Sequence, residues 1–289
     1  MKKLAFLIVF YACSNFVNAA EIVMPRVNAK LFIHNPQTDL DLITVKDAGL
    51  KEKWVKLLFD NDKIDHFGSK AFDPNARFDA YYKNFGPFYR LADLNNDEVP
   101  ELLFNGVVSD EDEREYVEIY TYQKNELVNI YKEIGHIMAY KIQPNTQEVL
   151  LYHHQYPCCG NASHNLNRLR LVEGKIQSLK RYFVGRDTDM KGKFFPDSTK
   201  VTADYKVASK KMELRWSGEV ISKDAWYRRT PDNIIAHYEP GAVYNLLAEE
   251  NGWYFVLVHA APIKEASYVI NADNFKETWI YGWVDKTKL

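Results

Sequence analysis

The chain has 289 residues, and 46% of them are hydrophobic, so it can bury the core of one large domain or of two modest ones. Its formal net charge is -2, so no basic field points to a nucleic-acid partner. Beyond residue 20 no segment is long and apolar enough to span a membrane. We therefore expect neither a nucleic-acid binder nor a transmembrane span.

The first twenty residues have the pattern of a secretory signal peptide. Lys2 and Lys3 supply the positive start, residues 4–10 are apolar, and residues 17–20 supply small side chains before a cleavage point. We expect cleavage after residue 20 and a mature protein that is periplasmic or secreted. A lipoprotein anchored through Cys13 is the alternative, although bulky Tyr11 stands where a small residue is usual.

Helices are expected only in the first part of the mature chain. After an irregular lead-in with one strand at residues 29–34, residues 48–59 have the apolar spacing of an amphipathic helix. Its apolar face consists of Trp54, Val55, Leu57, Leu58 and Phe59. A second helix is predicted at residues 76–83.

Between residues 85 and 184, short runs of aromatic and β-branched residues alternate with turn residues. This spacing predicts an antiparallel meander. The expected strands are residues 88–91, 101–104, 116–122, 127–133, 136–142, 148–156, 165–172 and 176–184. They fall into two groups of four, like two propeller blades. Two blades cannot close a propeller, so we expect an open or packed sheet.

A strong hairpin signal stands in the last third of the chain. Asn251 and Gly252 separate two apolar runs, and both residue types tolerate the positive φ of a tight hairpin turn. Trp253 directly after this turn and Trp283 near the end would then be core or groove aromatics on adjacent strands.

The region from residue 213 to residue 289 resembles the bacterial SH3 domain. Four segments match that family in order: AWYRRTP at 225–231, EPGAVYNLL at 239–247, EENGWYFV at 249–256 and GWV at 282–284. The resemblance implies a small SH3-like β-barrel, and such modules in exported bacterial proteins commonly bind cell-wall peptides or other proteins. The candidate ligand-binding residues are Trp253, Tyr254, Tyr281 and Trp283. Residues 259–276 form an insertion relative to the family, placed where it can reshape or cover the usual groove.

The expected fold class is α+β but mainly β, with an antiparallel meander domain that carries one or two helices, followed by the SH3-like barrel. The expected divisions are a signal peptide at 1–20, a β-rich domain at 21–184, a polar linker at 185–212 and the barrel at 213–289. Phe194 and Phe195 indicate that the linker packs on another part of the protein.

Residues 93–101 form an acidic loop with oxygen-bearing side chains at its first, third, fifth and ninth positions. These side chains belong to Asp93, Asn95, Asp97 and Glu101. In a tight loop they converge with the carbonyl of Val99, and Ca²⁺ takes about six to eight hard oxygen ligands. The segment also resembles calcium-loop β-repeats of the FG-GAP and EF-hand-like type, which implies a structural Ca²⁺ site.

Two features of this loop depart from the calcium-loop pattern. The sixth position, usually glycine for a sharp turn, is Glu98, and the chain holds no second clear copy of the loop. The alternative is an Asn-rich β-turn with solvated carboxylates.

Three histidines and two cysteines fall within twelve residues, namely His153, His154, Cys158, Cys159 and His164. In an oxidising compartment we expect a vicinal disulfide between Cys158 and Cys159. Two reduced buried thiols, or a Zn²⁺ or Cu(I) site, are the alternatives. A shared metal is disfavoured because neighbouring residues of a strand, such as His153 and His154, point to opposite faces.

Binding rather than catalysis is the expected function. The ligand would be peptidoglycan or another envelope protein, and an inhibitor or immunity role is one version of that hypothesis. The alternative is a cell-wall hydrolase that uses the barrel for targeting, with Cys159 and His164 as nucleophile and base. The sequence contains no serine nucleophile elbow, phosphate loop or zincin helix, and we expect no cofactor besides Ca²⁺.

Overall fold

The structure is a computed structural model that describes ten ranges of the chain. These ranges are residues 29–61, 63–64, 77–107, 115–155, 163–186, 192–199, 204–222, 232–259, 264–265 and 278–289. The expected signal peptide, Cys13, Cys158 and Cys159 lie outside them, so export, lipidation and the vicinal disulfide stay predictions. The AWYRRTP segment at 225–231 and most of the insertion at 259–276 also lie outside the described residues. No helix in the described ranges is long and apolar enough to cross a membrane.

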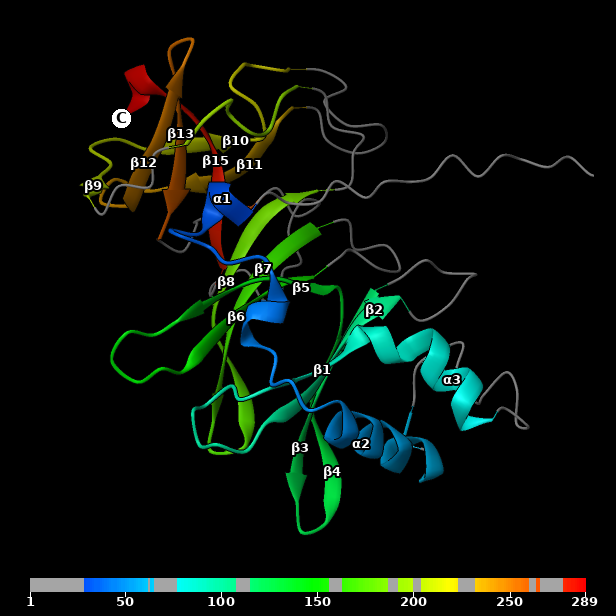
Figure 1. Cartoon of the computed structure of the whole chain (residues 1–289). Helices are drawn as coiled ribbons and strands as arrows, with labels where there is room; N and C mark the ends of the chain where they lie inside the picture. The colour runs from blue at the N-terminus through cyan, green and yellow to red at the C-terminus, as the bar shows by residue number, and fades with distance from the viewer. Residues whose placement is uncertain are drawn as a thin grey trace, which may run out of the picture.

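The protein is mainly β, with a few short helices in its first part (Figure 1). The helices are α1 (Ala29–Phe32), α2 (Ala48–Asp60) and α3 (Phe78–Phe85), with 3-10 turns at Leu40–Ile43, Gly86–Phe88 and Lys286–Lys288. The strands are β1 (Tyr89–Ala92), β2 (Glu101–Val107), β3 (Glu115–Gln123), β4 (Glu126–Ile134), β5 (His136–Ile142), β6 (Val149–Gln155), β7 (Ser163–Val172), β8 (Lys175–Arg186), β9 (Tyr205–Val207), β10 (Met212–Arg215), β11 (Ile234–Tyr238), β12 (Val243–Glu250), β13 (Trp253–Val258), β14 (Lys264–Glu265) and β15 (Thr278–Asp285).

The first eight strands form the predicted antiparallel meander. Strands β1 to β4 make one sheet in sequence order, and β5 to β8 continue the meander within a second, larger sheet. The turns at Lys124–Asn125 and Glu173–Gly174, each between two predicted strands, have positive φ at both residues, as tight hairpins require. The prediction of two groups of four strands is therefore confirmed, and they pack as two sheets.

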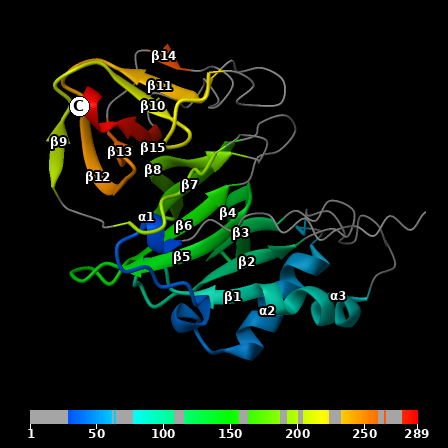
Figure 2. The same cartoon turned by 90° about the horizontal axis from the view of Figure 1, so that it is seen from above.

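Three layers make up this half of the molecule, as Figure 2 shows from above: the helices α2 and α3, the first sheet, and the strands β5 to β8. Helix α2 begins at the N-cap Asp47, whose side chain accepts a hydrogen bond from the Leu50 amide. Its apolar face, with Trp54 and Leu58, packs on Leu102 and Phe104 of β2. Between these two residues Leu103 faces the second sheet, because successive side chains of a strand alternate in direction.

The C-terminal strands join the second sheet through β15. Strand β15 pairs antiparallel with β13 along its length. It also pairs parallel with β8 at Thr278–Ile280 and antiparallel with β10 at Trp283. Beyond these, β13 pairs with β12 and β12 with β9, while β10 pairs with β11 and β11 with β14. In the described residues this path ends at β9 and β14 without closing, so a closed barrel is not found.

One local prediction is wrong, and the linker has more structure than expected. The segment predicted as a strand at residues 29–34 begins with helix α1 instead. Among the described residues, no strand pairs with residues 29–34. The Phe32 ring packs on the rings of Tyr281 and Phe195. In the linker, β9 pairs with β12, and Phe194 lies in the core of the C-terminal strands.

The N-terminal and C-terminal parts share one hydrophobic core. Residues of the meander, such as Leu150 and Leu166, belong to the same buried cluster as Phe255 and Trp283 of the last strands. The expected division between residues 184 and 213 therefore crosses a continuous core rather than a solvated junction.

Gly135, between β4 and β5, tests how tightly the layers pack. It has a φ of +127°, and a Cβ there would overlap the carbonyl oxygen of His154 and lie 2.6 Å from Nε2 of His153. We expect Gly135→Ala to lower the free energy of unfolding by about 3 kcal/mol or more. Gly241→Ala is the control, because Gly241 has a φ of +95° but no atom near its Cβ position, and it should cost about 1 kcal/mol. Equal losses in urea unfolding would contradict the packing argument.

Candidate functional site

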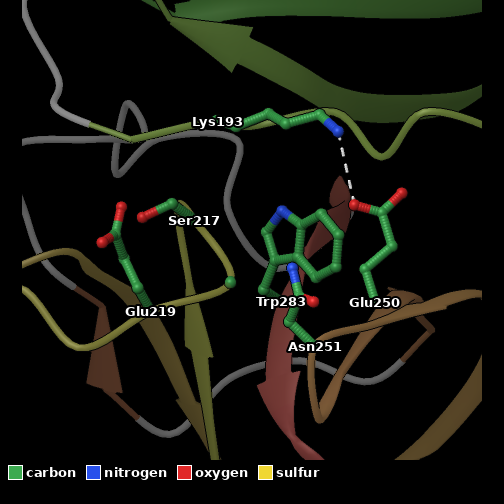
Figure 3. Close-up of a pocket in the computed structure, with 7 residues that line it drawn as sticks. Lys193, Ser217, Glu219, Glu250, Asn251 and Trp283 are labelled. Atoms are coloured by element: carbon green, nitrogen blue, oxygen red, sulfur yellow. Dashed lines mark hydrogen bonds and ion pairs between the residues drawn. The ribbon is translucent and has the colours of Figure 1, made fainter.

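A small cavity of about 100 Å³ lies where the C-terminal strands meet the linker (Figure 3). Its lining residues are Lys193, Ser217, Gly218, Glu219, Glu250, Asn251 and Trp283. Figure 3 shows the Trp283 indole between Ser217 and Glu219 on one side and Glu250 on the other, with Lys193 across the top. Asn251 and Trp283 come from the segments that resemble the bacterial SH3 family.

Trp283 is the aromatic floor of this cavity, and two glycines allow it to sit there. A Cβ on Gly218 would meet the indole at 3.2 Å, so this residue lies flat against the ring. A Cβ on Gly282 would come within 2.7 Å of Leu214, so the glycine before Trp283 lets β10 approach β15 closely. The indole Nε1 donates a hydrogen bond to the carbonyl oxygen of Phe194, 2.6 Å away.

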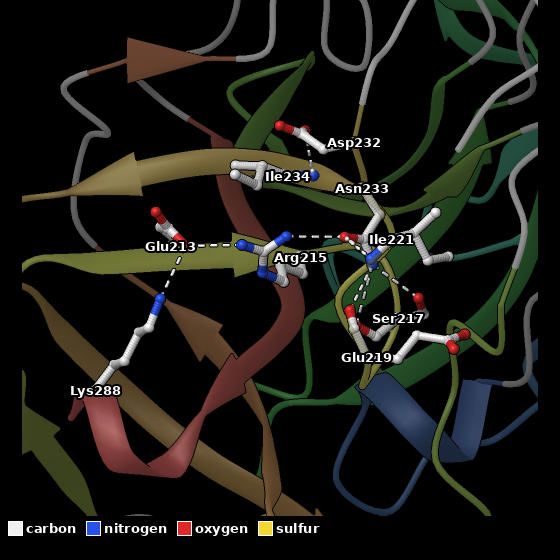
Figure 4. A network of polar contacts seen from close by, with 9 residues as sticks. All are labelled: Glu213, Arg215, Ser217, Glu219, Ile221, Asp232, Asn233, Ile234 and Lys288. Carbon is white, nitrogen blue, oxygen red and sulfur yellow. Dashed lines mark hydrogen bonds and ion pairs between the residues drawn. The ribbon is translucent and has the colours of Figure 1, made fainter. Parts of the chain in front are cut away.

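A buried polar network holds the wall formed by residues 217–219 (Figure 4). Asn233 is fully buried, and its amide nitrogen donates to Oγ of Ser217 and to the carbonyl of Glu219, each at 2.9 Å. Its amide oxygen accepts from Nη1 of Arg215 at 2.9 Å, and Nη2 of Arg215 reaches Glu213 at 2.8 Å. Because the buried Asn233 side chain is bonded on both its nitrogen and its oxygen, this wall is rigid.

The rim of the cavity carries charges of both signs. Nζ of Lys193 lies 3.3 Å from Oε2 of Glu250 and 2.7 Å from Asp197. The hydrogen bond with Asp197, assisted by Glu250, raises the pKa of Lys193. Glu219 on the opposite side is exposed. An aromatic floor under a cation and two carboxylates suits a small zwitterionic or peptide group.

The four predicted ligand-binding aromatics do not form one surface. Tyr281 and Trp283 are each only 2% exposed, and both rings pack on Phe255. Trp253 and Tyr254 are half-buried neighbours on β13 and do not line the cavity. Only Trp283 of the four does.

The other lining residues were not assigned from the sequence. Glu250 and Asn251 could have been found, because they belong to the turn that the SH3-like pattern includes. Lys193 and Ser217 come from the linker and from a bend after β10, and no local pattern marks them.

A wider hollow of about 390 Å³ lies at the start of α2, next to Lys51 and Arg90. Nε of Arg90 is paired with Asp41 at 3.0 Å, and Nζ of Lys51 donates to the carbonyl of Gly86. We regard the Trp283 cavity as the better candidate because Glu250, Asn251 and Trp283, which line it, belong to the segments that resemble the bacterial SH3 family.

The acidic loop turns sharply at Asp97 and Glu98. Both oxygens of Asp93 accept hydrogen bonds from backbone amides, those of Asp97 at 3.2 Å and Glu98 at 2.9 Å. Glu98 has a φ of +69°, so it takes the left-handed conformation although it is not glycine. Oδ1 of Asn95 is buried without a hydrogen-bond partner.

Glu101 closes the acidic loop from inside the fold. It is 2% exposed, and Oε2 accepts a hydrogen bond from the Leu94 amide at 3.0 Å. Burial raises its pKa to about 7, and the negative charges of Asp97 and Asp93 add to that effect. Among the residues that the structure describes, no three His, Cys, Asp or Glu side chains are placed to hold one metal ion.

The three histidines lie on two faces of β6 and β7, as the alternation of a strand predicts. His153 faces the first sheet, where Nδ1 lies 2.8 Å from the Tyr131 hydroxyl and Nε2 3.1 Å from the Ile134 carbonyl. His154 faces away, with Nε2 2.9 Å from Nδ1 of His164. Since Cys159 is outside the described residues, the pairing of Cys159 with His164 in the hydrolase hypothesis stays untested.

Comparison with known proteins identifies no relative of this chain. No family model matches it, and no curated protein matches it. The functional argument therefore rests on the chain's own residues.

Acid should destabilise the fold through the buried histidines. Burial, together with the charge of His136, lowers the pKa of His153 to about 3 and that of His154 to about 2. These values lie below the ordinary 6.5, so the stability they contribute is present above pH 6.5 and is lost as the pH falls toward 3. The two histidines alone would lower the free energy of unfolding by about 3 kcal/mol per pH unit in this window, the slope for two protons. Glu101 offsets about one proton of that slope between its folded pKa of about 7 and its ordinary 4.5, so we expect a net fall of about 1.4 kcal/mol per pH unit between pH 6.5 and 4.5.

Denaturant unfolding between pH 6.5 and 4.5 measures this slope. His154→Gln should reduce the slope of the unfolding free energy against pH by the contribution of one proton, about 1.4 kcal/mol per pH unit. His237→Gln, on β11 outside the cluster, is the control for the substitution itself. A slope that is the same in both variants would contradict the assignment.

Proposed function

We propose that this chain is an exported binding protein whose ligand is peptidoglycan or an envelope protein, held by an SH3-like module at residues 213–289. The observation that carries the proposal is the cavity over Trp283, where an aromatic floor lies beneath Lys193, Glu219 and Glu250. Its motivation from the sequence is the signal-peptide pattern together with the SH3-like segments.

The arrangement of the last strands supports the SH3-like assignment in part. The hairpin at Asn251 and Gly252 joins β12 and β13, and both residues have positive φ. The Gly-Trp-Val segment lies on β15 beside β13 and β10. Strand β9 pairs with β12, and β15 pairs with β8. The C-terminal strands therefore belong to a larger sheet than an isolated SH3-like module would form.

The chemistry of the cavity favours a peptide as the recognised group. A peptidoglycan stem peptide carries amino and carboxylate groups within a few bonds, and its amino group can meet Glu219 or Glu250 at the cavity rim. An apolar ligand would desolvate these carboxylates without forming hydrogen bonds to them. A protein ligand with an exposed peptide segment offers the same groups, so an inhibitor or immunity role is the second form of the proposal.

Sedimentation with purified peptidoglycan sacculi tests the function. We expect the protein to pellet with sacculi, and Glu219→Lys to weaken this binding about tenfold because it reverses one charge of the cavity rim. Glu239→Lys is the matched control, since Glu239 pairs with Lys211 outside the cavity. If the protein stays in solution and also captures no envelope protein, the proposed function is wrong.

We also propose that the acidic loop binds Ca²⁺ as a structural ion. Three observations support it: the unpartnered buried oxygen of Asn95, the left-handed turn at Glu98 and the inward carboxylate of Glu101. Asp93, Asn95, Asp97 and Glu101 would supply the oxygens, and the loop would have to close around the ion, because in the described residues these carboxylates are not already placed to hold one metal ion. The ion's positive charge would compensate the repulsion among these carboxylates and thereby stabilise the loop.

Thermal unfolding with and without calcium tests this site, at a pH above the Glu101 pKa of about 7. Millimolar Ca²⁺ should raise Tm by about 3 °C or more, and a chelator should reverse the rise. Asp93→Asn should abolish it. Asp79→Asn, an exposed position on α3, should keep it. A Tm that does not respond to Ca²⁺ in the unmodified protein would exclude the structural ion.

A further inference from the structure

Residues 192–197 of the linker, here named the strap, lie against the proposed binding site. The strap follows β8 and precedes β9, and it belongs to no strand. Its sequence is Gly-Lys-Phe-Phe-Pro-Asp. Its contacts with the C-terminal strands are those that peptide-binding domains use for an extended ligand.

The backbone of the strap is recognised by side chains of the sheet. The carbonyl of Phe194 accepts the hydrogen bond from Nε1 of Trp283, and the amide of Asp197 donates to Oε1 of Glu250 at 2.6 Å. Because the strap pairs with no strand, these two side chains take the place of a β-ladder. Recognition of backbone groups by fixed side chains holds an extended peptide whatever its sequence.

Side chains of the strap add the specificity. The Phe194 ring is 6% exposed and packs on Trp216, with centroids 4.4 Å apart, and on Phe255 at 5.9 Å. Nζ of Lys193 pairs with the same Glu250 that binds the Asp197 amide. The residues that contact the strap, namely Glu250, Trp216 and Phe255, therefore bind a cation followed by a buried aromatic residue.

The first residue of the strap, Gly192, lies directly against the cavity wall formed by residues 217–219. Gly192 has a φ of +93°, and a Cβ there would lie 2.5 Å from Oγ of Ser217 and 2.7 Å from Oε1 of Glu219. The backbone of the strap can approach this wall only because the residue is glycine. The strap thus contacts the cavity along its length, from Ser217 and Glu219 across to Glu250.

We propose that the strap is an internal ligand of the SH3-like module and that an external peptide of the same pattern competes with it. The external ligand is an extended peptide with a basic residue directly before an aromatic one, so the inference selects the protein form of the proposed ligand over a peptidoglycan stem peptide, which has no aromatic residue. The inference rests on the proposed function, since it assigns the occupant of the same site. It predicts that the resting protein binds weakly and that loosening the strap exposes the site.

Fluorescence polarisation of a labelled peptide with the sequence of residues 192–197 tests the inference on the purified protein. Phe194→Ser removes the buried ring of the strap and leaves the receiving residues unchanged. We expect this variant to bind the peptide about tenfold more tightly than the unmodified protein. Glu250→Gln added to it should reverse most of the gain, because Glu250 contacts the cation and the amide. A peptide with Lys193 and Phe194 exchanged should bind neither protein.

Lys193→Ala covers the case in which Phe194→Ser fails to fold. Lys193 is half exposed, so its loss loosens the strap without opening the core, and peptide binding should tighten about threefold. Lys211→Ala, an exposed lysine outside the site, is the control. Equal peptide affinity in the unmodified protein and in a folded strap variant overturns the inference.

The sacculus experiment separates this inference from the proposed function. Tighter peptide binding by the strap variants without any binding to sacculi or an envelope protein supports the internal ligand and refutes the proposed natural ligand. Binding to sacculi with no response to the strap variants refutes the internal ligand alone.

Discussion

The pairing of β15 on both of its edges is the interaction on which the rest of the structure depends. One edge is taken by β13, and the other is divided between β8 at Thr278–Ile280 and β10 at Trp283. This arrangement joins the meander to the C-terminal strands in one sheet and buries Trp283 at their junction. Gly282 makes it feasible, since any larger residue would collide with Leu214 and hold β10 away.

The same junction explains why the candidate site lies between segments far apart in the chain. Trp283 comes from the last strand, Ser217 and Glu219 from the bend after β10, and Glu250 from the end of β12. The buried Asn233 connects the bend to β11 through its side-chain hydrogen bonds. A cavity built in this way is small and rigid, which suits recognition of a short polar group better than enclosure of a large ligand.

The linker is part of the site rather than a spacer. Phe194 lies in the shared core and Lys193 at the cavity rim, so the chain between the two halves forms part of the cavity lining. The histidines of β6 and β7 are likewise buried inside the fold. Burial lowers the pKa of His153 and His154 and so keeps both imidazoles neutral, and the strand places the two rings in separate environments. Within the described residues they pair with each other and with neighbouring groups rather than around one ion.

The sequence by itself determined the elements whose signals are local. Strand alternation, the turns at Lys124–Asn125 and Asn251–Gly252, and the amphipathic face of α2 depend on neighbours within a few residues, and all are present in the structure. Only the tertiary structure decided the rest. Residues 29–34 begin in helix α1, and Phe32 packs on Tyr281 of the last strand and on Phe195 of the linker. Tyr281 is buried because both faces of β15 are covered, and Lys193 reaches the site because the linker folds back on the sheet. These outcomes depend on contacts between distant segments, which periodicity and turn residues do not encode.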